Sequence, residues 1–268
     1  MAAFSHVVVG LDGSDAACHA LRWVSSRVSP SGLDIVHAGT PDPLVPDDIA
    51  FNSIHSDDMP PADLLISSAQ QMGADAIVIG PHGSGAGRGL GRVARQLLNQ
   101  AAVPVIVVGE PELPRSPNLD PPVVACVGYG EPATAAAEWA AAYADQQKLP
   151  LVLLHAVAYR PIFPFDAASD VLASYLGAGV SAAWASDELV ELAKDLAASY
   201  PDLAISTHVD STSVIRSVRN AGEAAEIVVL GKRNDEEFLH AIGTPRLRRL
   251  VARAHFPTAV VPCPPTTH

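Results

Sequence analysis

The sequence contains few of the residues that cross-link a chain or bind metals. Only 3 cysteines occur among 268 residues; they lie far apart and form no C-x-x-C pair. An odd, scattered set argues against a disulfide framework and against a zinc site, and fits a reducing compartment. The 10 histidines show no H-E-x-x-H or similar ligand spacing. No metal site is therefore predicted.

Long apolar runs are missing as well. The first residues, MAAFSHVVVGLDGSD, contain no basic segment, and their apolar run stops at Asp12, which argues against a signal peptide. No uninterrupted apolar stretch reaches the roughly 18 residues that a membrane span requires. We therefore expect a cytoplasmic protein without a membrane partner.

Positive charge is scarce. The chain has 17 Lys and Arg against 29 Asp and Glu, so its net charge is −12. A nucleic-acid binder needs a broad basic surface to neutralise phosphates, so no nucleic-acid partner is predicted. Hydrophobic residues make up 49% of the chain, which is enough for a large core, and the length allows two domains.

What the sequence does contain is an internal duplication. HVVVGLDGSDAACHALRWVSSRV (6–28) resembles PVVACVGYGEPATAAAEWAAAYA (122–144): each has a β-branched strand, a turn and an Ala-rich helix with one Trp. A strand with a His follows in both copies, as LDIVHAG and LPLVLLHAV. ADAIVIGPHG then matches AEIVVLGKRN, and the proline-led strand at 104–108 matches that at 257–261. The duplication predicts two similar domains.

The predicted domains are residues 1–112 and 122–268, joined by a Pro-rich linker at 113–121. Only the second copy contains a long helical pattern, at 169–200, followed by a strand near 203–209.

The first copy has only PDPLVPDDIAFNSIHSDDMP at the corresponding place. We expect it to have lost the long helix and to keep a short strand near residues 50–55. The loss should expose an apolar surface, which the second domain or a second chain would cover.

The strands of both copies are continuous apolar runs, such as VVVG, AIVIG and VIVV. Such runs are typical of parallel strands covered on both faces, so the fold class is α/β, with two tandem doubly wound, Rossmann-like parallel sheets. Ligands of these sheets bind beyond the carboxyl ends of the strands. Asp12, Ala38 and Gly80 all follow or end predicted strands and should meet at one crevice.

A glycine-rich loop follows one of these strands. GPHGSGAGRGLGRVAR (80–95) contains six glycines before it becomes a helical pattern. Successive backbone N–H groups that lead into a helix N-terminus form an anion site, and Arg88 and Arg92 add positive charge. The loop is neither a Walker A motif nor a G-x-G-x-x-G motif. By itself such a loop is weak evidence for phosphate binding, and a flexible turn is the alternative.

The order and spacing of VVVGLDGSDAACHALRW, the His-bearing strand, GADAIVIGPHG and VPVIVV closely resemble the universal stress protein family, in the tandem two-domain form common in actinobacteria. The resemblance covers nearly the whole chain. It implies a five-stranded parallel sheet in each domain and a stress-induced regulator, often dimeric, without defined catalytic chemistry. Many members bind ATP, through an Asp after the first strand and a Gly-x-x-Gly, nine residues, Gly-Ser/Thr pattern.

The resemblance carries over only in part. Asp12 matches the Asp near the adenosine, although it is equally suited to capping the helix that starts near Ser14. Gly80, Gly83 and Gly91 match the three motif glycines, but the loop is two residues short and Arg92 replaces the Ser or Thr. Arg92 would either contact phosphate or fill the pocket. The implied site consists of Leu11, Asp12, Ala38, Gly39, Gly80, Gly83, Ser84, Gly91, Arg92 and Val93, with His82 as a further candidate.

The second copy departs further from the pattern. Gly128 stands where the first copy has Asp12, and the loop GKRNDEEFLHAIGT replaces a glycine by Asn234. Three carboxylates, at 235–237, would repel a triphosphate at close range. We expect no ATP site there.

Three functions remain open. The first is a non-catalytic regulator that binds ATP, with or without Mg²⁺, in its first domain. The second is an interaction scaffold that has lost nucleotide binding, and the third is a weak ATPase or nucleotidyl-transfer enzyme, which would need a second carboxylate near Asp12. The proline-led strands predict pairing at a sheet edge, in a homodimer or an intramolecular pseudo-dimer.

Overall fold

The computed structural model describes residues 4–38, 52–56, 58–83, 89–109, 120–128, 131–156, 186–210, 212–232 and 250–263. Its strands form one 10-stranded sheet in the order β3-β2-β1-β4-β5-β10-β9-β6-β7-β8. In the first half of the chain the elements are β1 (Val7–Gly10), α1 (Asp15–Ser25), β2 (Leu33–Ala38), β3 (Asn52–Ser56), α2 (Pro61–Met72), β4 (Ala76–Ile79), α3 (Arg92–Gln100) and β5 (Val105–Val108). In the second half they are β6 (Val123–Cys126), α4 (Glu131–Gln147), β7 (Leu151–Ala156), a helix at 186–199, β8 (Ile205–Asp210), α6 (Val214–Ala224), β9 (Ile227–Lys232) and β10 (Pro257–Pro262).

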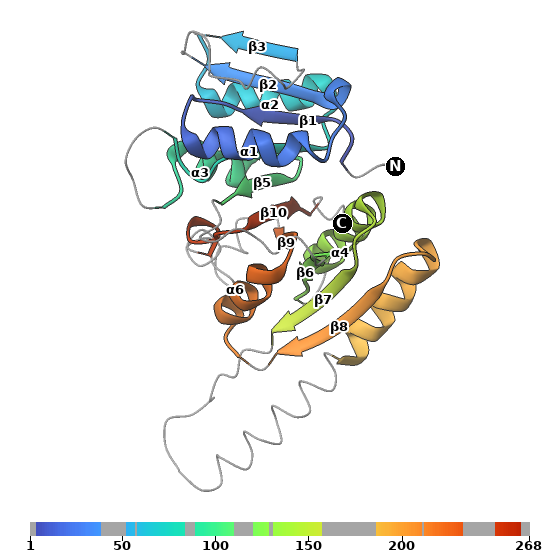
Figure 1. Ribbon diagram of the computed structural model, residues 1–268. Helices are drawn as coiled ribbons and strands as arrows, with labels where there is room; N and C mark the ends of the chain where they lie inside the picture. Colours follow the sequence, from blue (N-terminus) through green and yellow to red (C-terminus); the bar gives the residue numbers. More distant parts are fainter. Residues whose placement is uncertain are drawn as a thin grey trace, which may run out of the picture.

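Each half is a doubly wound parallel sheet, as predicted, and the two have the same strand order (Figure 1). The halves join where β5 and β10 pair antiparallel, with Val108 opposite Pro257 and Val105 opposite Val260. This confirms that the proline-led strands pair at the sheet edges, and the pairing occurs within one chain. We call the contact between the halves, with the residues packed around it, the seam.

Helix α1 follows from its sequence. Ser14 has extended backbone angles and its hydroxyl accepts a hydrogen bond from the Ala17 N–H, which is the usual arrangement at a helix N-cap. Asp15 in the first turn complements the helix dipole. Buried residues then recur at helical spacing, at Ala16, Ala17, Ala20, Leu21, Trp23 and Val24. Helix α1 therefore lies flat on the sheet, with its N-terminus beside the carboxyl end of β1.

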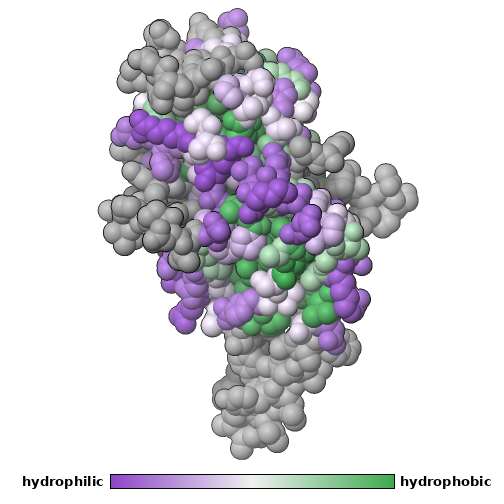
Figure 2. Space-filling model, turned by 45° about the vertical axis from the view of Figure 1, so that its right-hand side comes forward, coloured by the Kyte–Doolittle hydropathy of each residue, from purple (hydrophilic) through white to green (hydrophobic). Residues whose placement is uncertain are grey.

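Alternate strand residues belong to two cores, one on each face of the sheet. The first contains Val7 and Val9 and is covered by α1, α4 and the helix at 186–199; the second contains Val8 and is covered by α2, α3 and α6. This arrangement explains why the strands are apolar on both faces. Figure 2 shows hydrophilic residues across the middle of one side of the molecule and apolar surface below them, on the second half.

Aromatic residues from both halves meet at the seam. The Phe4 ring makes edge contacts with Trp23, Trp139 and Tyr143, with centroids 6.0, 6.5 and 5.3 Å away, and Trp139 stacks on Tyr143. Gln146 of α4 also hydrogen-bonds both backbone groups of Phe4. Trp23 and Trp139 occupy matching places in the two copies of the duplicated sequence. They also share a cluster that holds the halves together.

Two charged residues reach across the seam. Arg27, just beyond the end of α1, makes an ion pair with Glu226. Glu226 immediately precedes β9 and is only 5% exposed. The Arg27 guanidinium also lies 4.5 Å from the centre of the Trp23 ring. On the other face of the sheet, Lys232 Nζ donates a hydrogen bond to the Asn99 carbonyl in the last turn of α3, at 2.6 Å. Both contacts connect the second half to a helix end of the first half.

The described residues at the β3 edge of the first half include no counterpart of the extra helix, and they form a polar edge. Strand β3 confirms the short strand predicted near residues 50–55. On the face that the extra helix covers in the second half, β3 presents Ser53, which is exposed and hydrogen-bonds His37. Among the described residues of this half, Met59 alone is a large exposed apolar side chain. The described residues at this edge therefore show no large exposed apolar surface.

The turn between β8 and α6 is held by a carboxylate. Hydrogen bonds from the Ser217 hydroxyl and then from the Thr212 backbone lower the pKa of Asp210 below its ordinary value of 3.8. A lowered pKa in the folded state means that this stabilisation is present above pH 4 or so and is lost as the pH falls through the folded-state pKa.

Replacing Asp210 with asparagine should therefore lower the free energy of unfolding at pH 7, by less than about 1 kcal/mol because the carboxylate is partly solvated. Urea titrations from pH 7 to pH 3 should show the difference shrinking toward the acid end. A difference that grows toward pH 3 would contradict this assignment.

Candidate functional site

The loop after β1 carries the first predicted site residues. Leu11 is buried, and its N–H donates to the Val36 carbonyl at 3.0 Å, which brings this loop to the carboxyl end of β2. Asp12 is exposed, and its Oδ1 accepts hydrogen bonds from the Ser14 N–H at 3.1 Å and from the Ser14 hydroxyl at 2.6 Å. Ser14, not Asp12, caps α1. The capping role considered for Asp12 therefore belongs to its neighbour, while Asp12 orients that neighbour.

Two glycines permit the close approach of β4 and its loop to these residues. A Cβ on Gly80 would lie 2.9 Å from the backbone carbon of Ala16, so the first turn of α1 rests directly on this glycine. A Cβ on Gly83 would lie 2.1 Å from Asp12 Oδ2. The carboxylate therefore lies against the main chain of the glycine-rich loop, as expected for residues that follow neighbouring parallel strands.

Helix α3 starts next to this contact. The Gly91 N–H donates to the Pro81 carbonyl at 2.8 Å, and a Cβ on Gly91 would lie 3.4 Å from the Cα of His82 and 3.8 Å from the Gly83 nitrogen. Gly91 is the N-cap and offers no side-chain hydrogen bond to the first turn. Backbone N–H groups at an uncapped helix start attract anions.

The remaining predicted residues lie around this start. Arg92 is the first residue of α3 and is exposed, Val93 is half-buried against the core, and His82 is exposed at the loop. Ala38 ends β2 at the same edge of the sheet. Gly39, Ser84 and Arg88 lie outside the described residues. The structure thus brings together Asp12, Gly80, Gly83 and Gly91, with Arg92 and His82 beside them.

Ser14 and the Pro81 carbonyl are the site residues that sequence reasoning missed. The signal for Ser14 was present, since a Ser two residues before an Ala-rich run is typical of a cap. The carbonyl of Pro81 carried no signal, because its role depends on how the loop returns to Gly91.

The second half repeats the backbone arrangement without the carboxylate. The Val127 N–H donates to the Leu154 carbonyl at 2.8 Å, as Leu11 does to Val36. Gly128 replaces Asp12, is exposed, and a Cβ there would meet nothing within 4 Å. The predicted loop changes, from Asn234 to Thr244, lie outside the described residues.

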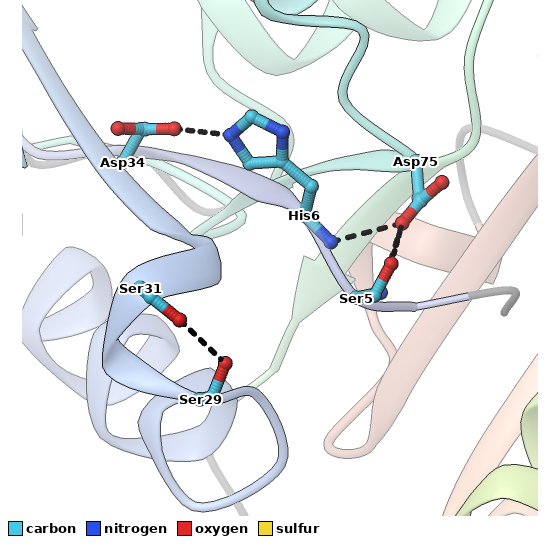
Figure 3. A network of polar contacts seen from close by, with 6 residues as sticks. All are labelled: Ser5, His6, Ser29, Ser31, Asp34 and Asp75. Carbon is cyan, nitrogen blue, oxygen red and sulfur yellow. Dashed lines mark hydrogen bonds and ion pairs between the residues drawn. The ribbon is translucent and has the colours of Figure 1, made fainter.

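A serine, a histidine and two aspartates gather at the amino ends of β1, β2 and β4, away from this site (Figure 3). His6 Nε2 pairs with Asp34, whereas the Ser5 hydroxyl donates to Asp75 Oδ2 at 2.8 Å, as does the His6 N–H at 2.9 Å. A hydrolytic triad requires a serine bonded to the histidine. Here the serine is bonded to a carboxylate instead, and the network fixes the start of β1.

Neither a metal centre nor a membrane span is found in the described part of the chain. No group of three or more His, Cys, Asp or Glu side chains there is arranged to hold a metal ion. None of the described helices is long and apolar enough to cross a membrane.

Comparison with known proteins agrees with this architecture. The universal stress protein family model matches residues 47–109. Universal stress protein Rv2623 of Mycobacterium tuberculosis strain H37Rv is 27% identical over 269 residues, which cover 85% of this chain and 86% of that protein. Universal stress protein MT2698 of strain CDC 1551 matches to the same extent.

Two solved structures show the same fold over almost the whole chain. A universal stress protein from Archaeoglobus fulgidus superimposes with a TM-score of 0.62 at 14% identity, covering 96% of both chains. The functionally unknown protein PA1789 from Pseudomonas aeruginosa PAO1 gives a TM-score of 0.59 at 13% identity, covering 97% of this chain and 93% of that one.

The fold and the contact of Asp12 with Gly83 together define a tandem, doubly wound α/β protein with a glycine-rich loop at the carboxyl ends of its first-half strands. Residues 47–109 match the universal stress protein model, and the chain as a whole is similar to universal stress proteins of Mycobacterium tuberculosis.

Proposed function

We propose that this chain is a non-catalytic regulatory protein of the cytoplasm that binds ATP in its first half. The observation that carries the proposal is the contact of Asp12 with Gly83 beside the uncapped start of α3. A carboxylate that accepts ribose or adenine hydrogen bonds is thereby adjacent to a backbone that attracts phosphate. ATP combines these two chemistries in one molecule.

The residues present fit such a ligand. A Cβ on Gly83 would overlap the Asp12 carboxylate, so the close approach of the loop to Asp12 requires a glycine there, whereas a Cβ on Gly91 would meet its neighbours only at ordinary contact distances. The first-turn N–H groups of α3 and the guanidinium of Arg92 would hold phosphates, with or without Mg²⁺. Asp12, Ala38 and Gly39 would hold the nucleoside. These roles position a nucleotide but supply no nucleophile.

An alternative is a scaffold that no longer binds nucleotide. It is favoured by one observation: Arg92 is exposed at the first position of α3, where a hydroxyl-bearing residue would be smaller. An arginine there either contacts phosphate or occupies its place. Nucleotide titration distinguishes the two, because only the first gives saturable binding.

Isothermal titration of the whole chain with ATP is expected to give one saturable site. Asp12→Asn should weaken the affinity about tenfold, the cost of one charge-assisted hydrogen bond. Asp15→Asn is the matched control, because Asp15 is also exposed and acidic but lies on α1 rather than against the loop.

The proposal fails if millimolar ATP gives no saturable heat, and the scaffold is then the better description. Equal affinities of the two variants would remove Asp12 from the site. Steady ATP hydrolysis that Asp12→Asn abolishes would contradict the non-catalytic role.

The seam bears on oligomeric state. In this chain β5 and β10 pair with each other, so the edge that a homodimer would use through these strands is occupied. This supports an intramolecular pseudo-dimer, and sedimentation of the intact chain at the monomer mass is the expected result.

A further inference from the structure

We propose that the second half of the chain binds a small amine whose apolar body is about the size of one six-membered ring. The site is a cavity between the N-terminal part of α4 and the helix at 186–199. It is lined by Val127, Gly128, Ala133, Thr134, His155, Glu188, Leu189 and Leu192.

The cavity is separate from the position of the glycine-rich loop. It lies at the carboxyl ends of β6 and β7, where ligands of doubly wound sheets bind. Val127, Ala133 and Leu189 belong to the core on the α4 face of the sheet, whereas the helices that follow the glycine-rich loops pack on the opposite face. Three lining residues come from the helix at 186–199, and the described residues of the first half include no counterpart of that helix.

The size of the cavity sets the size of the ligand. Its volume is about 140 Å³. An apolar cavity of roughly 150 Å³ in another protein accepts a single benzene ring. The apolar part of the wall comes from Val127, Ala133, Leu189 and Leu192, so a ring or a short branched chain would be buried there.

A buried histidine makes one part of the cavity wall polar. His155 is 5% exposed, and its Nδ1 donates to the Val127 carbonyl at 2.8 Å. His37, at the matching place in the first half, instead hydrogen-bonds Ser53 on the edge strand, 3.1 Å away. The His155 ring is thus turned toward β6, where it lines the cavity.

The charge of the lining selects an amine. Glu188 is exposed and is the one formally charged lining residue other than the titratable His155, and Thr134 adds a hydroxyl that can accept a hydrogen bond. A carboxylate attracts an ammonium group and repels a carboxylate ligand of the same shape. The net charge of the whole chain, −12, acts in the same direction.

The test is a titration of the ¹⁵N-labelled full chain with benzylamine, benzyl alcohol and benzoate, followed by amide chemical shifts. Benzylamine is expected to bind saturably with about millimolar affinity and to shift the amides of the lining residues first. Benzyl alcohol should bind more weakly and benzoate not detectably. Absence of saturable shifts at the lining, or equal affinity for all three compounds, would overturn the proposal.

Two variants then assign the charge. Glu188→Gln should weaken benzylamine binding about fivefold and leave benzyl alcohol unchanged, since an exposed charge pair contributes at most about 1 kcal/mol. Glu191→Gln is the control, because Glu191 is exposed on the same helix but pairs with Lys194 and does not line the cavity. Equal loss in both variants would mean that the helix charge acts at a distance and that Glu188 is not in the site. This result is independent of ATP binding in the first half.

Discussion

Replacing Arg27 with methionine is expected to lower the free energy of unfolding by about 3 kcal/mol, because it removes the charged partner of a buried carboxylate. Glu226 is only 5% exposed, and Arg27 Nε donates to its Oε1 at 2.6 Å. Methionine retains an apolar stem over the Trp23 ring, so the loss reports the charge rather than the packing. Urea denaturation followed by far-ultraviolet circular dichroism measures the change.

A double variant tests whether the lost stability comes from the unpaired Glu226 carboxylate rather than from a disturbed fold. Arg27→Met combined with Glu226→Leu should recover most of the lost stability, since replacing both members of a buried pair by apolar residues is close to neutral. Arg22→Met is the control, because Arg22 is exposed near the end of α1, and should change stability by less than about 0.5 kcal/mol. If Arg27→Met behaves like Arg22→Met, the contact across the seam contributes no stability.

Gly222→Ala should destabilise the protein by about 2 kcal/mol, although the same change in a helix interior ordinarily stabilises by about 1 kcal/mol. A Cβ at this position of α6 would lie 2.2 Å from Phe256 Cζ and 2.4 Å from both Cε atoms. The Phe256 ring is buried in a close-packed core and cannot withdraw without opening a void. The overlap therefore outweighs the helix propensity.

The stability change caused by Gly222→Ala should reverse its sign when the Phe256 ring is replaced by a smaller side chain. In a Phe256→Leu background, Gly222→Ala is expected to be neutral or stabilising, so that thermal and urea unfolding give a coupling energy above 1 kcal/mol. Asn220→Ala, on the exposed side of α6, should have the same small effect in both backgrounds. Additivity of the Gly222 and Phe256 changes would mean that the two residues do not press on each other.

The duplication explains why so much of the fold could be predicted. Paired copies of each strand identified β5 and β10 as equivalent, and a Pro before each indicated a sheet edge. Asp12 and Gly83 could be predicted to meet because parallel strands end at a common edge of the sheet. Such arguments need only the chain order and the direction of each strand.

The contacts that need a second helix or the other half could not be predicted. Arg27 and Glu226 are 199 positions apart, and neither position carries a local signal for the other. From the sequence, Gly222 is only a residue of low helix propensity. The structure shows that the Phe256 ring packs against it and leaves no room for a Cβ. The role of Arg92 could not be predicted for the same reason, since it depends on the path of the loop and not on the residue type.

Because both halves belong to one chain, the contacts between them need not be symmetric. Between identical subunits every contact occurs twice, so a favourable pair at one end repeats at the other. Here the places equivalent to Arg27 and Glu226 are Tyr143 and Asp75, given that Val7 opposite Ala76 corresponds to Val123 opposite Ile227. Asp75 instead fixes the start of β1. A covalent tether keeps the halves at high local concentration whatever the dilution. The sequence of each half can therefore diverge while the halves stay associated. The carboxyl ends of the strands in the two halves need not bind the same ligand.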